Sequence, residues 1–316
     1  MDILLLVITI ITIFYVAWSI GANDETMAVV AGSGFTSLAG AVAIAAIMDF
    51  LGALIFGYKV EETLGKHLLN FELTLIDTFI LSISIATWLI LASVKGWPVS
   101  TTHSAVGAAI GLGLVRMGLN SINWYSLTNV VFGWVFSPVA GLIGAYIIIK
   151  LFDIFIKPRN MHMGLKISRI ASLILLIWSA YTSFFRGAND VANATAFLVA
   201  IYPHPEVVRF VGGLGMALGV YILGRRVVKN VGLELVEMSP ITGLAVQVSV
   251  ALTISIGTML GLPLSGTHVL VAAVAGLGIA KKYWLNIKGL KEILMTWVVT
   301  FPGAAIMAIL LGIFIR

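Results

Sequence analysis

Residues 187–193 read Gly-Ala-Asn-Asp-Val-Ala-Asn, and this stretch decides how the rest of the sequence is interpreted. It follows an apolar run from Ile170 to Phe185, where a carboxylate is unexpected, because an ionisable side chain at membrane depth costs roughly 2.5 to 3.5 kcal/mol. Residues 21–24 repeat its first four positions, again after an apolar run. Two acidic residues in matching places, Asp24 and Asp190, therefore predict a functional site with two related halves.

The composition is that of an integral membrane protein. Hydrophobic residues make up 60% of the 316 positions and charged residues only 10%, whereas soluble domains carry about 25% charged residues. Apolar runs of about 20 residues recur along the chain, which is the length that a membrane-spanning helix needs. The sequence thus predicts an all-α polytopic membrane protein in a lipid bilayer. It contains no cysteine, which excludes disulfides and thiolate metal sites.

The second half of the chain repeats the first. Gly21, Pro98 and Trp134 recur as Gly187, Pro263 and Trp297, in the same order and at an offset of about 165 residues. Residues 1–149 are predicted to form the first membrane repeat, residues 150–169 a basic cytoplasmic linker and residues 170–316 the second repeat. The crossings predicted in the first repeat are residues 3–20, 38–56, 73–93, 99–115 and 124–149.

Five crossings per repeat make the second repeat enter the membrane from the opposite side. The repeats are therefore predicted to be inverted, with broken or re-entrant helices at the midplane. With both termini outside, 13 of the 19 Lys and Arg residues fall in cytoplasmic loops and 6 outside, among them Arg116, Arg186 and Arg209. A re-entrant run at residues 99–115 gives at best 11 to 8, so ten crossings are favoured. These basic clusters account for the net charge of +5, and no nucleic-acid partner is expected.

The Gly-Ala-Asn-Asp words suit a cation site. Small residues let a helix break, and Asn and Asp supply the hard oxygen ligands that a small cation such as Na⁺ prefers. N-capping of the following helix by the Asp is the alternative, and both can hold at once. The predicted cation-binding residues are Asn23, Asp24, Asn189, Asp190 and Asn193, with Asp24 and Asp190 as the ligands of Na⁺.

A second pair of words suits an anion. Residues 98–103 read Pro-Val-Ser-Thr-Thr-His, and residues 263–268 read Pro-Leu-Ser-Gly-Thr-His. Proline followed by hydroxyl residues is typical of a helix start, whose free N–H groups bind anions. A plain helix cap is the alternative for each word taken alone. The predicted substrate-binding residues are Ser100, Thr101, Thr102, Ser265, Gly266, Thr267 and Gln247, a polar residue within an apolar run.

Three more polar residues lie in or beside these runs. His103 and His268 are expected to form hydrogen bonds to neighbouring helices, because two isolated histidines do not suit a metal site. Asp49 has no acidic counterpart in the second half. An extra cation site and a position facing a cavity are both open for this residue.

At these four words the sequence resembles the inorganic phosphate transporter (PiT) family of cation-coupled phosphate permeases. Each half of that family carries a Gly-Ala-Asn-Asp-x-x-Asn word and a Pro-x-Ser-Thr-Thr-His word. The resemblance covers almost the whole chain and implies Na⁺ or H⁺ coupling, inverted halves, outward termini and homodimers. Met27 stands in place of an Asn, which implies a lost ligand or the use of Glu25 or Thr26, and Gly266 stands in place of a Thr.

The sequence therefore predicts a secondary active symporter that imports inorganic phosphate with Na⁺ or H⁺ by alternating access, in the plasma membrane. Helix ends and bound cations are expected to balance the charge of the anion without an arginine. A sulfate permease on the same scaffold is the alternative, and an anion channel is a more remote one. An enzyme is not expected, because no metalloprotease helix, nucleophile elbow or P-loop is present. No cofactor is expected apart from the coupling ion.

Overall fold

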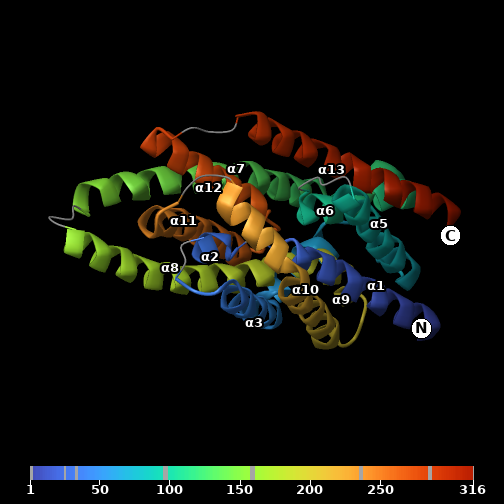
Figure 1. The fold of residues 1–316 in the computed structure, drawn as a ribbon. Helices are drawn as coiled ribbons and strands as arrows, with labels where there is room; N and C mark the ends of the chain where they lie inside the picture. Colours follow the sequence, from blue (N-terminus) through green and yellow to red (C-terminus); the bar gives the residue numbers. More distant parts are fainter. Residues whose placement is uncertain are drawn as a thin grey trace.

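The computed structural model describes residues 3–24, 26–32, 35–94, 99–156, 161–234, 238–283 and 287–315. Within these ranges the chain is helical, apart from turns, short extended segments and a single β-bridge between Leu69 and Ile122. Eight of the helices described are long and apolar enough to cross a membrane. They form an elongated bundle of long helices (Figure 1). The predicted all-α polytopic membrane fold is confirmed.

The long helices follow the predicted crossings. In the first half they are α1 (Ile3–Ala22), α3 (Leu38–Phe56), α5 (Leu75–Val94) and α7 (Trp124–Phe155). In the second half they are α8 (Met161–Asp190), α10 (Pro205–Glu234), α11 (Pro240–Met259) and α13 (Ile287–Phe314). The shorter elements are α2 (Ala28–Gly32), α4 (Tyr58–Glu62), the π-helix η1 (Thr63–His67), α6 (Thr101–Met117), the 3-10 helix η2 (Gly118–Ser121), α9 (Ala192–Val199) and α12 (Gly266–Lys281).

Two of the ten predicted crossings are short helices that start inside the protein. α6 has 17 residues and α12 has 16, which at about 1.5 Å per residue is less than the roughly 30 Å of a bilayer core. The first turns of both helices are buried. Both helices are shorter than the eight helices that are long and apolar enough to cross a membrane, so the count of ten crossings stays a prediction. Hydropathy does not distinguish a short buried helix from a crossing, because both are apolar.

Helices of the two halves pack in reciprocal pairs. α1 packs along α10, and α3 packs along α8. In the same way α6 packs along α13, and α12 packs along α7. The start of α1 and the end of α13 lie at one end of the bundle, while the end of α7 and the start of α8 lie at the other (Figure 1). This interleaving brings the start of each short helix close to segments that are distant in the sequence.

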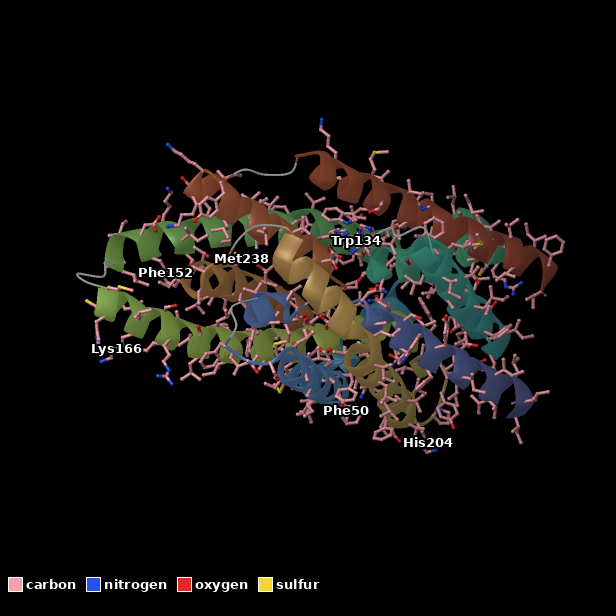
Figure 2. The ribbon with its side chains drawn as sticks, viewed as in Figure 1. Phe50, Trp134, Phe152, Lys166, His204 and Met238 are labelled. Atoms are coloured by element: carbon pink, nitrogen blue, oxygen red, sulfur yellow. The ribbon has the colours of Figure 1, made fainter. Side chains whose placement is uncertain are left out.

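The predicted linker at residues 150–169 lies mostly within helices, and its boundaries stay a prediction. α7 continues to Phe155 and α8 begins at Met161, which leaves only residues 156–160 between them. Asp153 of α7 forms an ion pair with Lys281 of α12. Lys166 projects outward from α8 (Figure 2). Charged residues on exposed helix ends have the same composition as a loop, so the basic composition of residues 150–169 does not distinguish the two.

Three of the six basic residues assigned to the outside form ion pairs within the bundle. Arg116 Nε donates to Asp77 Oδ1 at 2.7 Å, and Arg209 Nη2 donates to Glu61 Oε2 at 2.6 Å. The third, Arg186, lies in the candidate site described below. A charge that is paired inside the protein does not report the side of the membrane. The orientation therefore stays a prediction that depends on the remaining basic residues.

Candidate functional site

Both Gly-Ala-Asn-Asp words lie where a helix is interrupted. The first word ends α1, and the chain leaves the helix at Asn23 before α2 begins. The second word ends α8 at Asp190, and α9 begins after a break at Val191. Asp24 and Asp190 are buried, each with 6% of its surface exposed. The predicted break at the first word is confirmed, whereas at the second word Val191 keeps helical backbone angles and only a short interruption separates α8 from α9.

Arg186, in the last turns of α8, joins the two acids. Its Nε lies 3.1 Å from Asp190 Oδ2, and its Nη1 lies 3.3 Å from Asp24 Oδ1. Nη1 also donates to Thr26 Oγ1 at 3.2 Å. An unpaired buried charge costs several kcal/mol, so the guanidinium and the two carboxylates hold one another in place. Asp24 and Asp190 therefore share one site through a residue that was not predicted.

The prediction that Arg186 lies in an outside loop is wrong, and the site contains an arginine where none was expected. A signal for it does exist in the sequence. Arg186 directly follows the apolar run that ends at Phe185. An ionisable side chain at membrane depth is costly, so Arg186 is a candidate functional residue for the same reason as Asp190. Asp190 lies four positions later, on the same face of the helix, and is a suitable partner.

The two hydroxyl-rich words start helices α6 and α12, as predicted. The N–H of His103 donates to Ser100 Oγ at 3.3 Å, and the N–H of His268 donates to Ser265 Oγ at 3.5 Å. Thr102 Oγ1 donates to the carbonyl of Leu264 at 2.9 Å, so the two starts contact each other. Capping is thus observed. It satisfies one N–H group per helix and leaves the other first-turn N–H groups without helical partners, so anion binding stays compatible with it.

A cavity of about 20 Å³ lies where the four words meet. A cavity of this size holds roughly one water molecule, so it is too small for a tetrahedral oxyanion. Every polar residue that lines it was predicted, except Arg186. The lining consists of Asn23, Ser100, Thr101, Arg186, Asp190, Ser265, Gly266 and Thr267, together with Ile20 and Val99.

The second helix start is supported from α7. Trp134 lies near the middle of the bundle (Figure 2), and its Nε1 donates to the carbonyl of Pro263 at 3.0 Å. The carbonyl lies just before the cap residue Ser265, where the chain is extended. Trp134 therefore helps to fix the approach of the chain to α12.

Gln247 lies on the other side of Arg186. It lines a neighbouring cavity of about 10 Å³ together with Arg186, Thr26 and Gly266. Gln247 is buried, and among the described residues neither its Oε1 nor its Nε2 has a hydrogen-bond partner. A buried carboxamide without partners is unusual, so both of its polar atoms are available to a ligand. Its role in substrate binding stays a prediction.

Asn193 connects the second acidic word to the first helix start. Its Nδ2 donates to Thr101 Oγ1 and to Thr102 Oγ1, at 3.2 Å in each case. Its Oδ1 is buried and has no hydrogen-bond partner in the described part of the chain. One oxygen atom of the predicted cation-binding set is thus fixed in place with its acceptor capacity unused.

Asn189 has a different position from the predicted one. Its Nδ2 donates to Thr258 Oγ1 at 3.0 Å and to the carbonyl of Leu262 at 2.9 Å. Its Oδ1 accepts from the N–H of Leu264 at 3.0 Å. The carboxamide therefore holds the extended segment that leads into α12. These contacts favour a positioning role and give no support to cation binding by Asn189.

We expect Asn189→Leu to lower the thermal stability of the protein by several degrees. The change leaves the N–H of Leu264 and the carbonyl of Leu262 without their partner, and each buried unsatisfied group costs about 1–3 kcal/mol. Thermal unfolding of the purified protein in detergent measures this. Asn23→Leu is the matched control, because Asn23 is exposed and its Nδ2 donates only to the carbonyl of Ser19 in its own helix. Equal stability of the two variants would contradict the positioning role.

Asp49 is a third buried acid near the site. It lies in α3 with none of its surface exposed, and neither carboxylate oxygen has a hydrogen-bond partner among the described residues. A side chain on Gly187 would overlap the backbone of Asp49, so α3 and the second acidic word are in direct contact. The charged residues that act electrostatically on Asp49 are Asp24, Arg186 and Asp190. This position favours the extra cation site that the sequence left open.

The two motif histidines meet behind the helix starts. The ring centroids of His103 and His268 are 4.8 Å apart. His268 stacks on Trp297 at 3.4 Å, and His103 packs edge-on against Trp134 at 4.0 Å. Neither ring nitrogen of His103 and not the Nε2 of His268 has a hydrogen-bond partner within the described ranges, so the predicted hydrogen bonds to neighbouring helices are not seen at these atoms. Aromatic packing takes their place.

Several known proteins are similar to this chain. A model of the phosphate transporter family matches residues 20–308. A protein of Pyrococcus furiosus assigned as a phosphate permease is 31% identical, over 96% of this chain and 94% of the relative. The chloroplastic inorganic phosphate transporter 2-1 of Arabidopsis thaliana is 28% identical, over 94% of this chain and 70% of the relative. A solved structure described as the sodium-dependent phosphate transporter is 28% identical, with a TM-score of 0.92 over 99% of both chains.

Proposed function

The chain belongs to the phosphate transporter family, and on that premise we propose that it is a symporter that imports inorganic phosphate together with Na⁺ by alternating access. One observation carries the proposal. The two acidic words and the two hydroxyl-rich helix starts, from both halves of the chain, line one cavity. A transporter that alternates between two open states binds its substrate at a shared site of this kind between its halves.

Phosphate is proposed to bind between the starts of α6 and α12. The first-turn N–H groups of both helices and the hydroxyl groups of Ser100, Thr101, Ser265 and Thr267 supply the donors. The guanidinium of Arg186 adds a positive charge at the same cavity. Because about 20 Å³ is too small for the anion, entry requires the helix starts to move apart. Alternating access supplies such a movement.

Na⁺ is proposed to bind beside Asp24 and Asp190. Na⁺ favours hard oxygen ligands, and the oxygens of Asp49 and Asn193 Oδ1 are buried nearby without hydrogen-bond partners among the described residues. Within the described ranges no three acidic, histidine or cysteine side chains form a group that could hold a metal ion. Neutral oxygen atoms would therefore complete the site. Protonation of one acid is the alternative form of coupling.

The two halves are proposed to be inverted repeats, residues 1–149 and 170–316, that move against each other. The reciprocal pairing of α1 with α10 and of α3 with α8 supports this arrangement. So does the direction of the two halves, because α1 starts and α13 ends at one end of the bundle while α7 ends and α8 starts at the other (Figure 1). Outward termini, a location in the plasma membrane and homodimers stay predictions.

Uptake of labelled phosphate into proteoliposomes tests this function. With an inward Na⁺ gradient we expect phosphate to accumulate above its external concentration, and with equal Na⁺ on both sides we expect only equilibration. A Na⁺ ionophore should abolish the accumulation. Accumulation of labelled sulfate instead of phosphate would identify a sulfate permease, and uptake that never exceeds equilibrium would identify a channel. Accumulation driven by a pH gradient without Na⁺ would identify H⁺ coupling.

A further inference from the structure

Arg186 occupies the position between two carboxylates that a bound cation is expected to occupy. Its guanidinium lies within 3.3 Å of Asp24 and 3.1 Å of Asp190, and all three side chains are at most 8% exposed. In so dry a position, each carboxylate needs a counter-charge close by. The protein itself supplies one here, on a side chain that cannot leave.

Gly266 makes room for this guanidinium. A Cβ atom at position 266 would lie 2.8 Å from Arg186 Nε, 3.0 Å from its Cζ and 3.1 Å from its Cδ. The corresponding residue in the first half is Thr101, which has a branched side chain. The departure of the second helix start from its own copy is therefore explained by Arg186. A side chain at position 266 and the observed position of Arg186 exclude each other.

The first acidic word also differs from the second in a way that accommodates Arg186. Thr26 Oγ1 accepts from Arg186 Nη1 at 3.2 Å and donates to Asp24 Oδ1 at 2.6 Å. Met27 stands where the second word has Asn193, and it is fully buried without an oxygen to offer. Asp24 thus has the guanidinium and a hydroxyl group as partners and lacks the carboxamide of the second half. Gly266 and Met27 each differ from the matching residue in the other half of the chain. Both differences suit an arginine in place of part of a ligand set.

We propose that Arg186 takes the place of one coupling cation, so that this protein binds and carries fewer Na⁺ ions than the same site without the arginine. The inference depends on the proposed function for its meaning in transport. Asp24, Asp190 and Asp49 are the carboxylates at the site, and the fixed guanidinium offsets one of their negative charges. Without Arg186 one more negative charge remains, and one more Na⁺ has both the charge and the space to bind.

The test counts the Na⁺ bound to purified protein in detergent, with radioactive Na⁺ and no phosphate present. We expect Arg186→Gln and the double variant Arg186→Gln with Gly266→Thr to bind about one Na⁺ more per chain than the parent, because each frees Asp24 and Asp190 from a fixed counter-charge. In the double variant the Thr fills the space that the shorter Gln leaves. It carries the test if the single variant does not fold.

Two controls keep the count specific. Arg186→Lys retains the positive charge and should leave the number of bound Na⁺ unchanged. Arg116→Gln removes another arginine paired with an aspartate, Asp77, and should also leave it unchanged. Gly266→Thr alone should be less stable than the double variant, because the single variant retains Arg186 and its guanidinium overlaps the new Thr side chain.

An unchanged Na⁺ count in both variants that lack Arg186 would overturn the proposal. If those variants instead show a raised KM for phosphate at saturating Na⁺ with the same count, Arg186 is an anion ligand only. The count does not require phosphate transport. A parent protein that takes up no phosphate would therefore refute the proposed function and still leave the role of Arg186 decided by the bound Na⁺.

Discussion

Replacing Asp190 by Asn is expected to abolish Na⁺-driven phosphate uptake. The change keeps the size of the side chain but removes the charge that accepts from Arg186 Nε at 3.1 Å. Breaking a buried ion pair by removing one partner costs about 3–5 kcal/mol. Both the cation site and the position of the guanidinium depend on this carboxylate. We therefore expect the initial rate of labelled phosphate uptake into proteoliposomes to fall by at least about 100-fold.

The matched control for this experiment is Asp153→Asn. Asp153 also pairs with a basic residue, Lys281, but this pair lies near the surface, with 41% of the Asp153 side chain exposed. Exposed pairs contribute about 0–1 kcal/mol, so uptake by this variant should stay close to that of the parent. Elution of each variant as a single species from a sizing column separates loss of transport from loss of folding. Full Na⁺-driven uptake by the Asp190 variant would show that the cation site is elsewhere.

The membrane fold was predictable because its causes are local in the sequence. A run of about 20 apolar residues is both the signal and the physical reason for a crossing. The run at residues 38–56 coincides with α3, and its neighbours differ by a few residues at each end. α6 has the 17 residues of the predicted run at 99–115, displaced by two positions. That it begins inside the protein follows from packing, which periodicity does not encode.

The candidate site was predictable as a set of words but not as a set of contacts. Repeated motifs predict that two segments belong to one functional site, and the cavity lined by Ser100, Asp190 and Ser265 agrees with that prediction. The pairing of Arg186 with Asp24 joins residues more than half the chain apart. Likewise Asn189 has the residue type of a cation ligand, and only the position of Leu264 beside it reveals its positioning role. Such roles follow from packing between halves, which a single sequence does not display.

Replacing Gly52 by Ala is expected to destabilise the whole bundle. A Cβ atom at Gly52 of α3 would overlap the carbonyl oxygen of Phe184 in α8, and backbone atoms in two packed helices cannot yield as a flexible side chain can. The helices must separate, and Phe184 lies only two residues before Arg186. Overpacking of this kind costs about 1–3 kcal/mol, which for a protein of this size corresponds to a fall in Tm of roughly 2–4 °C per kcal/mol. We expect the loss of uptake to exceed the loss of folded protein.

The reciprocal packing of the two halves sharpens this expectation. Gly219 of α10 lies against the backbone of Trp18 in α1, the same contact with the halves exchanged, so Gly219→Ala should lower Tm by a similar amount. Gly224→Ala is the control in the same helix, because the nearest atom to its Cβ would be Val220 Cγ1 at 3.6 Å, an ordinary contact. Thermal unfolding in detergent compares the three variants. If the Gly52 variant proves as stable as the Gly224 variant, the close approach of α3 and α8 does not hold Arg186 in place, and the geometry of the site must have another support.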